Sequence, residues 1–320
     1  MMIQAMFPTA ALLAFGLLLK LHFNFGDEFW RGAERLTYFI LLPALFINSL
    51  AKAQFDEFAV GRMALVVACA SVASGIMGLA VRPISGTNGA GFTSVFQGFV
   101  RFNNYIGATI AGTLFGIEGL ALAALCNAIL IPLGNIFSTL ALARWGTANV
   151  SGWGIVRAVL SNPLVMACFI GLSLNALGNW SPLIPLLDGI VMKTLLGTVS
   201  TGLALIGQAA LPIGLLCVGA GLSRAAGNLR GYTQPLLVAT IGRLVLVPAM
   251  AFGLACLLGL SGHAAIITVL FLALPTASSC YILARQLGGD APLAAAVVAT
   301  QTTAAMITLP LWIWLATSFF

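Results

Sequence analysis

Apolar stretches of about 20 residues recur along the whole chain, separated by short polar breaks or by breaks rich in glycine and proline. A helix of that length rises about 30 Å, which matches the hydrocarbon core of a bilayer. Transmembrane β-strands would be about ten residues long and alternate in polarity, a pattern that the sequence does not show. The hydrophobic pattern therefore predicts an all-α integral membrane protein.

Ten membrane-spanning helices are predicted from these stretches. Their expected ranges are 5–24, 33–51, 59–81, 90–116, 119–143, 154–178, 190–222, 235–258, 264–288 and 292–318. The seventh is long for a single crossing, and Pro182 and Pro185 interrupt the chain just before it. We therefore expect a short interfacial helix at the start of the seventh span.

The composition supports a protein embedded in a lipid bilayer. Hydrophobic residues make up 60% of the chain, charged residues 7%, and the mean hydropathy is +1.06. Soluble domains carry about 25% charged residues, so this chain cannot form a solvated surface. The net charge of +6 fits basic cytoplasmic loops, and no nucleic-acid partner is expected.

Basic residues in the predicted loops indicate the orientation. Eight follow odd-numbered spans: Arg31, Arg35, Arg82, Arg144, Arg157, Arg224, Arg230 and Arg285. Three lie on the opposite side: Lys52, Arg62 and Lys193. Because cytoplasmic loops carry the excess of lysine and arginine, both termini are expected outside the cytoplasm, in a multi-pass protein of the cell (inner) membrane.

The two halves of the chain resemble each other. Pro43 and Pro212 are 169 residues apart, Gly116 and Gly289 are 173 apart, and a third pair, Pro132 and Pro310, is 178 apart. This slowly drifting offset predicts two five-helix repeats, residues 1–148 and 149–320. Because five is odd, the second repeat would be inverted, as in many secondary transporters. A chance likeness between leucine-rich helices is the alternative.

The predicted fourth and ninth spans are each interrupted near the middle. Asn103 and Asn104 interrupt the fourth, and Pro275 interrupts the ninth. Asparagine, serine and threonine residues at these points are expected to cap new helix starts; in the ninth span they are Thr276, Ser278 and Ser279. Two half-helix N-termini that meet inside the membrane would favour an anion.

Arg101 lies in the same interrupted span. A central arginine costs about 2.5–3.5 kcal/mol on membrane-insertion scales. Every carboxylate of the sequence is assigned to a loop or a span end: Asp27, Glu28, Glu34, Asp56, Glu57, Glu118, Asp188 and Asp290. A bound substrate carboxylate would supply the missing negative charge. Alternatively, the side chain reaches the cytoplasmic surface or bonds backbone carbonyls.

The candidate substrate-binding set also includes two polar residues in other spans. Asn48 and Gln301 would either line the same cavity or link neighbouring helices. With them, the full set is Arg101, Asn103, Asn104, Pro275, Thr276, Ser278, Ser279, Asn48 and Gln301. The two histidines, His22 and His263, are far apart in sequence and hydrolase and nucleotide-binding motifs are absent, so no enzyme activity, metal or cofactor is expected.

Four segments of the chain together resemble the auxin efflux carrier family of membrane transporters. They are "FVRFNNYIGATIAGTLFGIEGLALA", "LSNPLVMACFIGLSLNALG", "GQAALPIGLLCVGAGLS" and "LPTASSCYILARQLGGDAPLAAAVV". The resemblance implies ten spans as two inverted repeats, and broken fourth and ninth helices that cross at the substrate site. It also implies scaffold and transport subdomains, elevator-type alternating access, and a homodimer.

Two features refine the function that the resemblance implies. The link at 144–153 is short, which resembles bacterial members associated with carboxylates such as malonate or malate. The ninth span has no acidic residue of the kind that sodium/bile-acid symporters use. The expected function is secondary transport of a small organic anion, a mono- or dicarboxylate or an auxin-like acid. A sodium-coupled symporter and a non-transporting receptor or scaffold are the alternatives.

Overall fold

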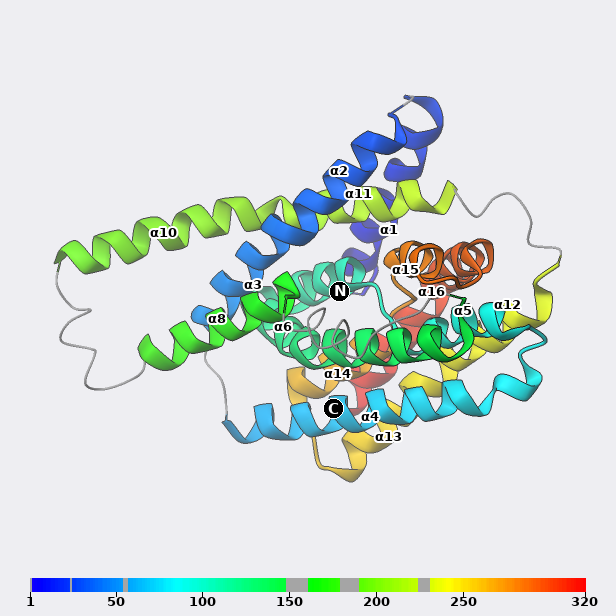
Figure 1. The fold of residues 1–320 in the computed structure, drawn as a ribbon. Helices are drawn as coiled ribbons and strands as arrows, with labels where there is room; N and C mark the ends of the chain where they lie inside the picture. The colour runs from blue at the N-terminus through cyan, green and yellow to red at the C-terminus, as the bar shows by residue number, and fades with distance from the viewer. Residues whose placement is uncertain (1, 24, 54–56, 148–160, 179–189, 224–230) are drawn as a thin grey trace.

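The computed structural model describes residues 2–23, 25–53, 57–147, 161–178, 190–223 and 231–320, and every regular element in these ranges is a helix (Figure 1). The first part of the chain forms α1 (Met2–His22), α2 (Asp27–Leu36), the π-helix η1 (Thr37–Leu41), α3 (Leu42–Ala51), α4 (Glu57–Ala80), the 3₁₀ turn η2 (Arg82–Ile84), α5 (Gly89–Val100) and α6 (Asn104–Trp145). The rest forms α8 (Pro163–Gly178), α10 (Ile190–Gln208), α11 (Ala210–Leu222), α12 (Thr233–Ile241), the π-helix η4 (Gly242–Leu246), α13 (Val247–Leu257), α14 (Gly262–Ala273), α15 (Ser279–Gln286) and α16 (Ala291–Phe319).

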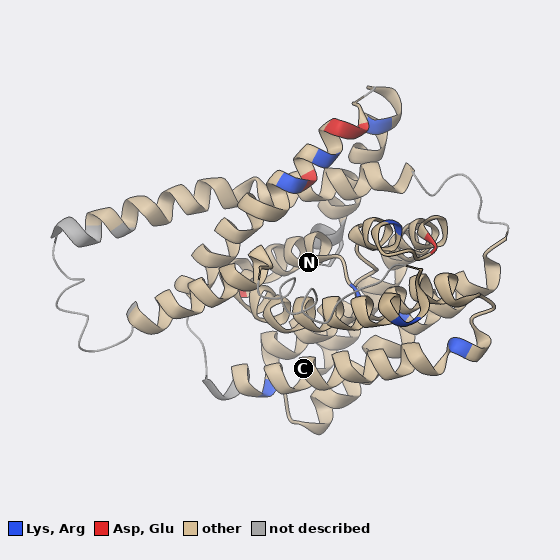
Figure 2. Cartoon of the chain, viewed as in Figure 1, with Lys and Arg blue, Asp and Glu red and all other residues tan. Residues whose placement is uncertain are grey.

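Five helical stretches in the described part of the chain are long and apolar enough to cross a membrane. They are Val60–Ala80, Gly89–Trp145, Gly197–Leu222, Thr233–Leu257 and Ala291–Phe319. Shorter apolar helices cover Phe7–His22, Pro163–Leu177 and Gly262–Ala273. The positions of these helices agree with predicted spans. Figure 2 shows that charged residues are sparse along most of the helices.

The stretch Gly89–Trp145 contains two departures from helical geometry. As one straight helix its 57 residues would be about 85 Å long, well over the thickness of a bilayer. The helix stops at Val100 and restarts at Asn104, and Gly116 within α6 has φ 58° and ψ −134°. Only glycine adopts this backbone conformation without strain. This kink coincides with the predicted end of the fourth span at Gly116.

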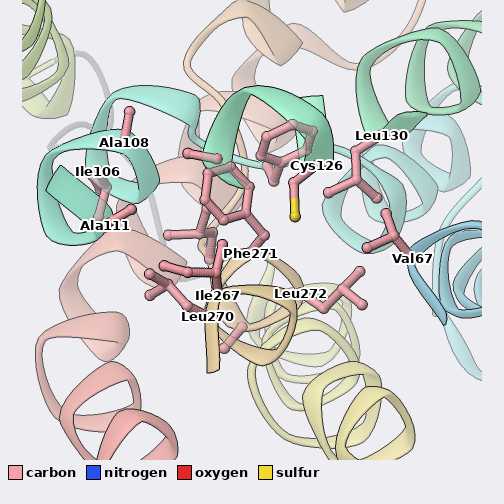
Figure 3. Close-up of a cluster of buried hydrophobic side chains, with 14 of the residues drawn as sticks. Val67, Ile106, Ala108, Ala111, Cys126, Leu130, Ile267, Leu270, Phe271 and Leu272 are labelled. Atoms are coloured by element: carbon pink, nitrogen blue, oxygen red, sulfur yellow. The ribbon is translucent and has the colours of Figure 1, made fainter. Parts of the chain in front are cut away.

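The helices pack in two groups. In the first, α1 packs against α11, and α3 packs against α8 and α10, with α2 also touching α11. The second contains α4, α5, α12, α13, α14, α15 and α16, and α6 contacts both groups. We call these the α1–α11 group and the α5–α14 group. A buried hydrophobic core between α4, α6 and α14 includes Val67, Ile106 and Phe271 (Figure 3).

Several expectations concern segments outside the described residues. They are the interfacial helix near Pro182 and Pro185, the start of the sixth span at residue 154, and the boundary between repeats at residue 148. The second span, in contrast, is described in full. The helical run α2–η1–α3 begins at Asp27, six residues before the predicted start at 33.

Candidate functional site

Two non-helical segments meet where the fourth and ninth spans are interrupted. The first, residues 101–103, joins α5 to α6, and the second, residues 274–278, joins α14 to α15. The backbone N–H of Asn103 donates to the carbonyl of Pro275 at 2.7 Å. The predicted breaks are therefore confirmed, and they contact each other directly.

The carbonyl ends of α5 and α14 are held by an arginine that sequence reasoning missed. Arg243, in η4, is only 2% exposed. Its guanidinium donates to the carbonyls of Leu274 at 2.7 Å, Phe99 at 2.9 Å and Phe271 at 3.3 Å. A cation is favourable at helix C-termini, where backbone carbonyls have no helical partner. The position of Arg243 inside the predicted eighth span was the sequence signal that could have identified this residue.

Gln301 and Thr276 reinforce the meeting point from within the protein. The Gln301 Oε1 atom accepts from the Thr276 backbone N–H at 2.9 Å and lies 2.7 Å from the Thr276 hydroxyl. Its Nε2 donates to the carbonyls of Ala239 at 3.0 Å and Gly98 at 3.2 Å. Gln301 thus links α16, α12, α5 and the segment 274–278.

Asn48 lies in a contact between α3 and α10. Its Oδ1 accepts from the hydroxyl of Ser200 at 3.2 Å, and the residue is buried. Asn48 and Gln301 were expected either to line the cavity or to link helices, and both residues form contacts between helices. Neither lines the cavity described next, and neither do Pro275 and Thr276.

A small cavity of about 90 Å³ opens beside the two helix starts. Its polar lining residues are Glu34, Tyr38, Arg101, Asn103, Asn104, Tyr105, Asn135, Ser278 and Ser279. Both α6 and α15 begin at its wall, so two helix N-termini contribute positive potential there. Five members of the predicted set therefore lie together: Arg101, Asn103, Asn104, Ser278 and Ser279.

Arg101 faces this cavity and bonds to side chains. Its Nη1 donates to Asn135 Oδ1 at 2.9 Å, and its Nη2 donates to Ser279 Oγ at 2.9 Å. The Nε atom is buried and has no hydrogen-bond partner among the described residues. Both printed bonds of the guanidinium go to side chains, so within the described residues it does not bond backbone carbonyls.

The predicted caps are only partly correct. Asn103 is the N-cap of α6, and its Oδ1 accepts from the Ile106 N–H at 3.3 Å, as predicted. Asn104 is instead the first helical residue, and no described residue bonds to its side-chain amide. Ser278 stands at the N-cap of α15 without a side-chain cap bond. The serine prediction is wrong because the two hydroxyls bond across the cavity, Ser278 to Glu34 and Ser279 to Arg101.

The expectation that no carboxylate lies near Arg101 is also wrong. Glu34 lines the same cavity, and Ser278 Oγ donates to its Oε1 at 3.2 Å. Because α2 begins at Asp27, Glu34 lies inside a continuous helical run and not at the start of a helix, as the predicted boundary at residue 33 implied. Trp30, Glu34 and Tyr38 recur at intervals of four, which places them on one helical face. That spacing was the sequence signal that could have placed Glu34 on a helix.

The cavity concentrates buried polar groups that find no hydrogen-bond partner in the part of the chain that the structure describes. Arg101 Nε, Asn103 Nδ2 and both amide atoms of Asn104 are in this state. Buried polar groups are paired in the great majority of cases, and each exception calls for an explanation. Three of these four atoms are N–H donors, so a ligand rich in acceptor oxygens is the complementary partner.

The described residues offer few side chains that could act together as metal ligands. They contain no group of three or more histidine, cysteine, aspartate or glutamate side chains that could hold a metal ion. His263 and Glu118 form an exposed pair at 3.0 Å. Neither residue lines the cavity.

Apolar helices interrupted around a polar cavity are an arrangement typical of secondary transporters, and comparisons with known proteins agree. A family model described as membrane transport protein matches residues 150–313, slightly more than half of the chain. The chain belongs to this family, the auxin efflux carrier family of membrane transporters. The predicted family is therefore confirmed, and the chain is a multi-pass membrane transporter.

Two archaeal relatives support this assignment. The chain is 23% identical to an uncharacterized transporter of Methanothermobacter thermautotrophicus, over 97% of this chain and 96% of the relative. It is 25% identical to an uncharacterized transporter of Methanocaldococcus jannaschii, over 66% of this chain and 64% of the relative.

Proposed function

We propose that this protein is a secondary transporter that moves a small organic anion across the cell membrane and binds it in the cavity at Arg101. The observation that carries the proposal is the cluster of unpaired donors there, Arg101 Nε with the amides of Asn103 and Asn104. A mono- or dicarboxylate, such as malonate, malate or an auxin-like acid, would supply the missing acceptors. The N-termini of α6 and α15 add positive potential at the same place.

The size of the cavity favours a small substrate. About 90 Å³ leaves room for several water molecules or a short-chain acid. A bulkier, auxin-like acid would require the cavity to widen. The described cavity therefore fits malonate or malate better than an aromatic acid.

The contacts at the two breaks support the inverted-repeat part of the proposal. Asn103 and Pro275, which bond to each other, are 172 residues apart, and so are Phe99 and Phe271, which both accept from Arg243. These separations fall within the offsets of 169–178 expected from the sequence. They are consistent with two repeats, residues 1–148 and 149–320, in a ten-span topology.

For the transport movement, we propose an elevator-type alternating access. The α1–α11 group would form the scaffold, and the α5–α14 group together with α6 would form the transport subdomain, which carries both broken spans. The scaffold would join two copies in a homodimer, with both termini outside the cytoplasm. These features follow from the family resemblance and from the loop charges.

Uptake of radiolabelled malonate or malate into proteoliposomes tests the proposed function. Arg101→Ala should lower uptake by about tenfold or more, because charge-assisted hydrogen bonds contribute about 1.5–3 kcal/mol. Arg101→Lys should retain part of the activity, since it keeps the charge but loses the planar fork. Arg285→Ala, which changes an exposed arginine on α15, is the matched control and should transport as the parent does.

Parental uptake by a folded Arg101→Ala variant would refute the anion site. Sodium dependence would favour the symporter alternative, whereas the proposal expects equal uptake in sodium and potassium buffers. Absence of flux for every carboxylate tested would favour a receptor or scaffold.

A further inference from the structure

We infer that Glu34 takes up one proton when the anion binds, so that the transporter moves its anion together with a proton. This inference rests on the proposed function and adds the coupling ion to it. Its basis is that a carboxylate and a guanidinium line one small cavity. Adjacent serines hold them, because Ser278 Oγ donates to Glu34 at 3.2 Å while Ser279 Oγ accepts from Arg101 at 2.9 Å.

Charge balance in the cavity is the first argument. Without a ligand, the positive charge of Arg101 and the negative charge of an ionised Glu34 balance. A monoanion would add a second negative charge close to the Glu34 carboxylate, and such a neighbour favours protonation of the carboxylate. Protonated Glu34 restores neutrality when a monocarboxylate is bound, and with a dicarboxylate dianion it reduces the net charge of the cavity from two negative charges to one. Because net charge is costly within a bilayer, proton uptake makes the loaded site better suited to movement in both cases.

The other groups that face Glu34 do not replace it as proton acceptor. Tyr105 of α6 and Cys217 of α11 interact electrostatically with Glu34, and Tyr38 lies one turn further along its own helical run. Phenol and thiol groups are ordinarily neutral near pH 7. Arg31 and Arg35 on α2 are exposed. Within the cavity lining, Glu34 is therefore the group with a carboxylate that can be neutralised.

A hydrogen-bond switch at Ser278 would link proton binding to anion binding. The Ser278 hydroxyl now donates to Glu34 Oε1. A protonated carboxyl group has its own O–H, which can donate back to Ser278 Oγ. The serine hydrogen is then released and can point to an anion in the cavity. Protonation of Glu34 would therefore remove a repulsive charge and add a donor in the same step.

The same bond joins the two helix groups. Glu34 belongs to α2 in the α1–α11 group, and Ser278 starts α15 in the α5–α14 group. Movement of one group against the other must break this contact. The bond between Ser278 and Glu34 is charge-assisted only while Glu34 is ionised, and a bond between two neutral groups is weaker, so protonation would also ease the movement.

Proton uptake on ligand binding tests the inference directly. Purified protein in weakly buffered detergent solution with a pH indicator is mixed with malonate, malate or benzoate, whichever raises its thermal stability most. At pH 7.5 the parent should take up about one proton per bound anion, and its Kd should rise about tenfold between pH 7 and pH 8. Glu34→Gln should bind without proton uptake and with a Kd that does not change with pH.

Two further variants distinguish proton binding by Glu34 from a purely structural role of this residue. Glu34→Asp keeps a carboxylate and should retain proton uptake, which a merely structural role for Glu34 would not require. Glu28→Gln removes an exposed carboxylate from the same helix and should behave as the parent does.

The outcomes distinguish this inference from the proposed function. If the parent binds the anion without proton uptake, or if Glu34→Gln takes up as many protons as the parent, the coupling at Glu34 is overturned. The proposed function as an anion carrier is not affected by either result. Tighter binding of a zwitterionic amino acid than of any carboxylate overturns it too, because Glu34 would then stay ionised. If no carboxylate binds the parent, the proposed function fails and the coupling fails with it.

Discussion

Two arginines, Arg101 and Arg243, lie at the place where the broken spans meet, and their surroundings differ. Arg243 sits beside the C-terminal ends of α5 and α14, and all its described hydrogen bonds go to backbone carbonyls. Arg101 sits beside the N-terminal ends of α6 and α15, where it bonds two side chains and keeps one unpaired nitrogen.

The difference follows from the polarity of the backbone. Carbonyl ends of helices are complemented by a cation, and Arg243 supplies one from the protein itself. N–H ends are complemented by an anion, yet the cavity there also contains the cation Arg101. The carbonyl ends of the break are therefore electrostatically complete, whereas at the N–H ends Glu34 balances the charge of Arg101 and the positive ends of α6 and α15 remain without an anion. The N–H ends are where a ligand is expected.

The largest effect that this comparison predicts is on stability, at Arg243. Arg243→Met should destabilise the protein by about 3–5 kcal/mol, because three buried carbonyl groups would lose their charged donor. Thermal unfolding of the purified protein in detergent measures this loss. Arg101→Met should lower the unfolding temperature much less, since its side chain is only partly buried. Similar losses for both variants would contradict the assigned division of roles.

A smaller loss is expected from the helix contact behind the break. Gln301→Leu should cost about 1–3 kcal/mol, because the Thr276 N–H and the Ala239 carbonyl would lose their partner in a buried place. Gln286→Leu, an exposed change at the end of α15, is the control and should leave unfolding unchanged. Equal unfolding temperatures for the two variants would show that Gln301 does not stabilise the break.

The finest distinction is between the two neighbouring asparagines. Asn103→Ala removes a helix cap and should cost about 1 kcal/mol of stability. Asn104→Ala removes a buried amide without partners, so stability should stay the same or rise, while anion binding should weaken. Calorimetric unfolding and ligand titration on both variants measure the two effects. A destabilised Asn104→Ala variant with full binding would reverse the roles assigned here.

The sequence predicted the breaks well because the signals for them are local. Asn103 and Pro275 stand out within apolar stretches, and both mark the observed interruptions. Arg243 follows the same rule and could have been found in the same way. Glu34 could not be placed as easily, because its assignment depended on where α2 begins. A shift of six residues moves a carboxylate from a span end to a helix interior, and hydropathy alone does not fix such boundaries.

Other parts of the site depend on tertiary contacts that a single sequence does not contain. Asn135 is visible as a polar residue within the predicted fifth span, but its bond to Arg101 joins positions 34 residues apart. Ser278 and Ser279 matched the expected cap residues, and their hydroxyls bond side chains from other helices instead. The residue types indicated which positions belong to the site, whereas the hydrogen-bond partners of these residues could be identified only from the folded structure.

The packing of α1 on α11 has a consequence for biosynthesis. A Cβ atom at Gly16 would overlap the backbone of Leu216, and one at Gly219 would overlap the backbone of Leu13, so the two helices approach each other through glycine. About 200 residues separate these partners, and a ribosome needs roughly 10–40 s to add them. During that interval the first helix to be made lacks its partner, and its glycine surface must be shielded by lipid or by the insertion machinery. Completion of the α1–α11 contact is therefore a late step in the assembly of this transporter.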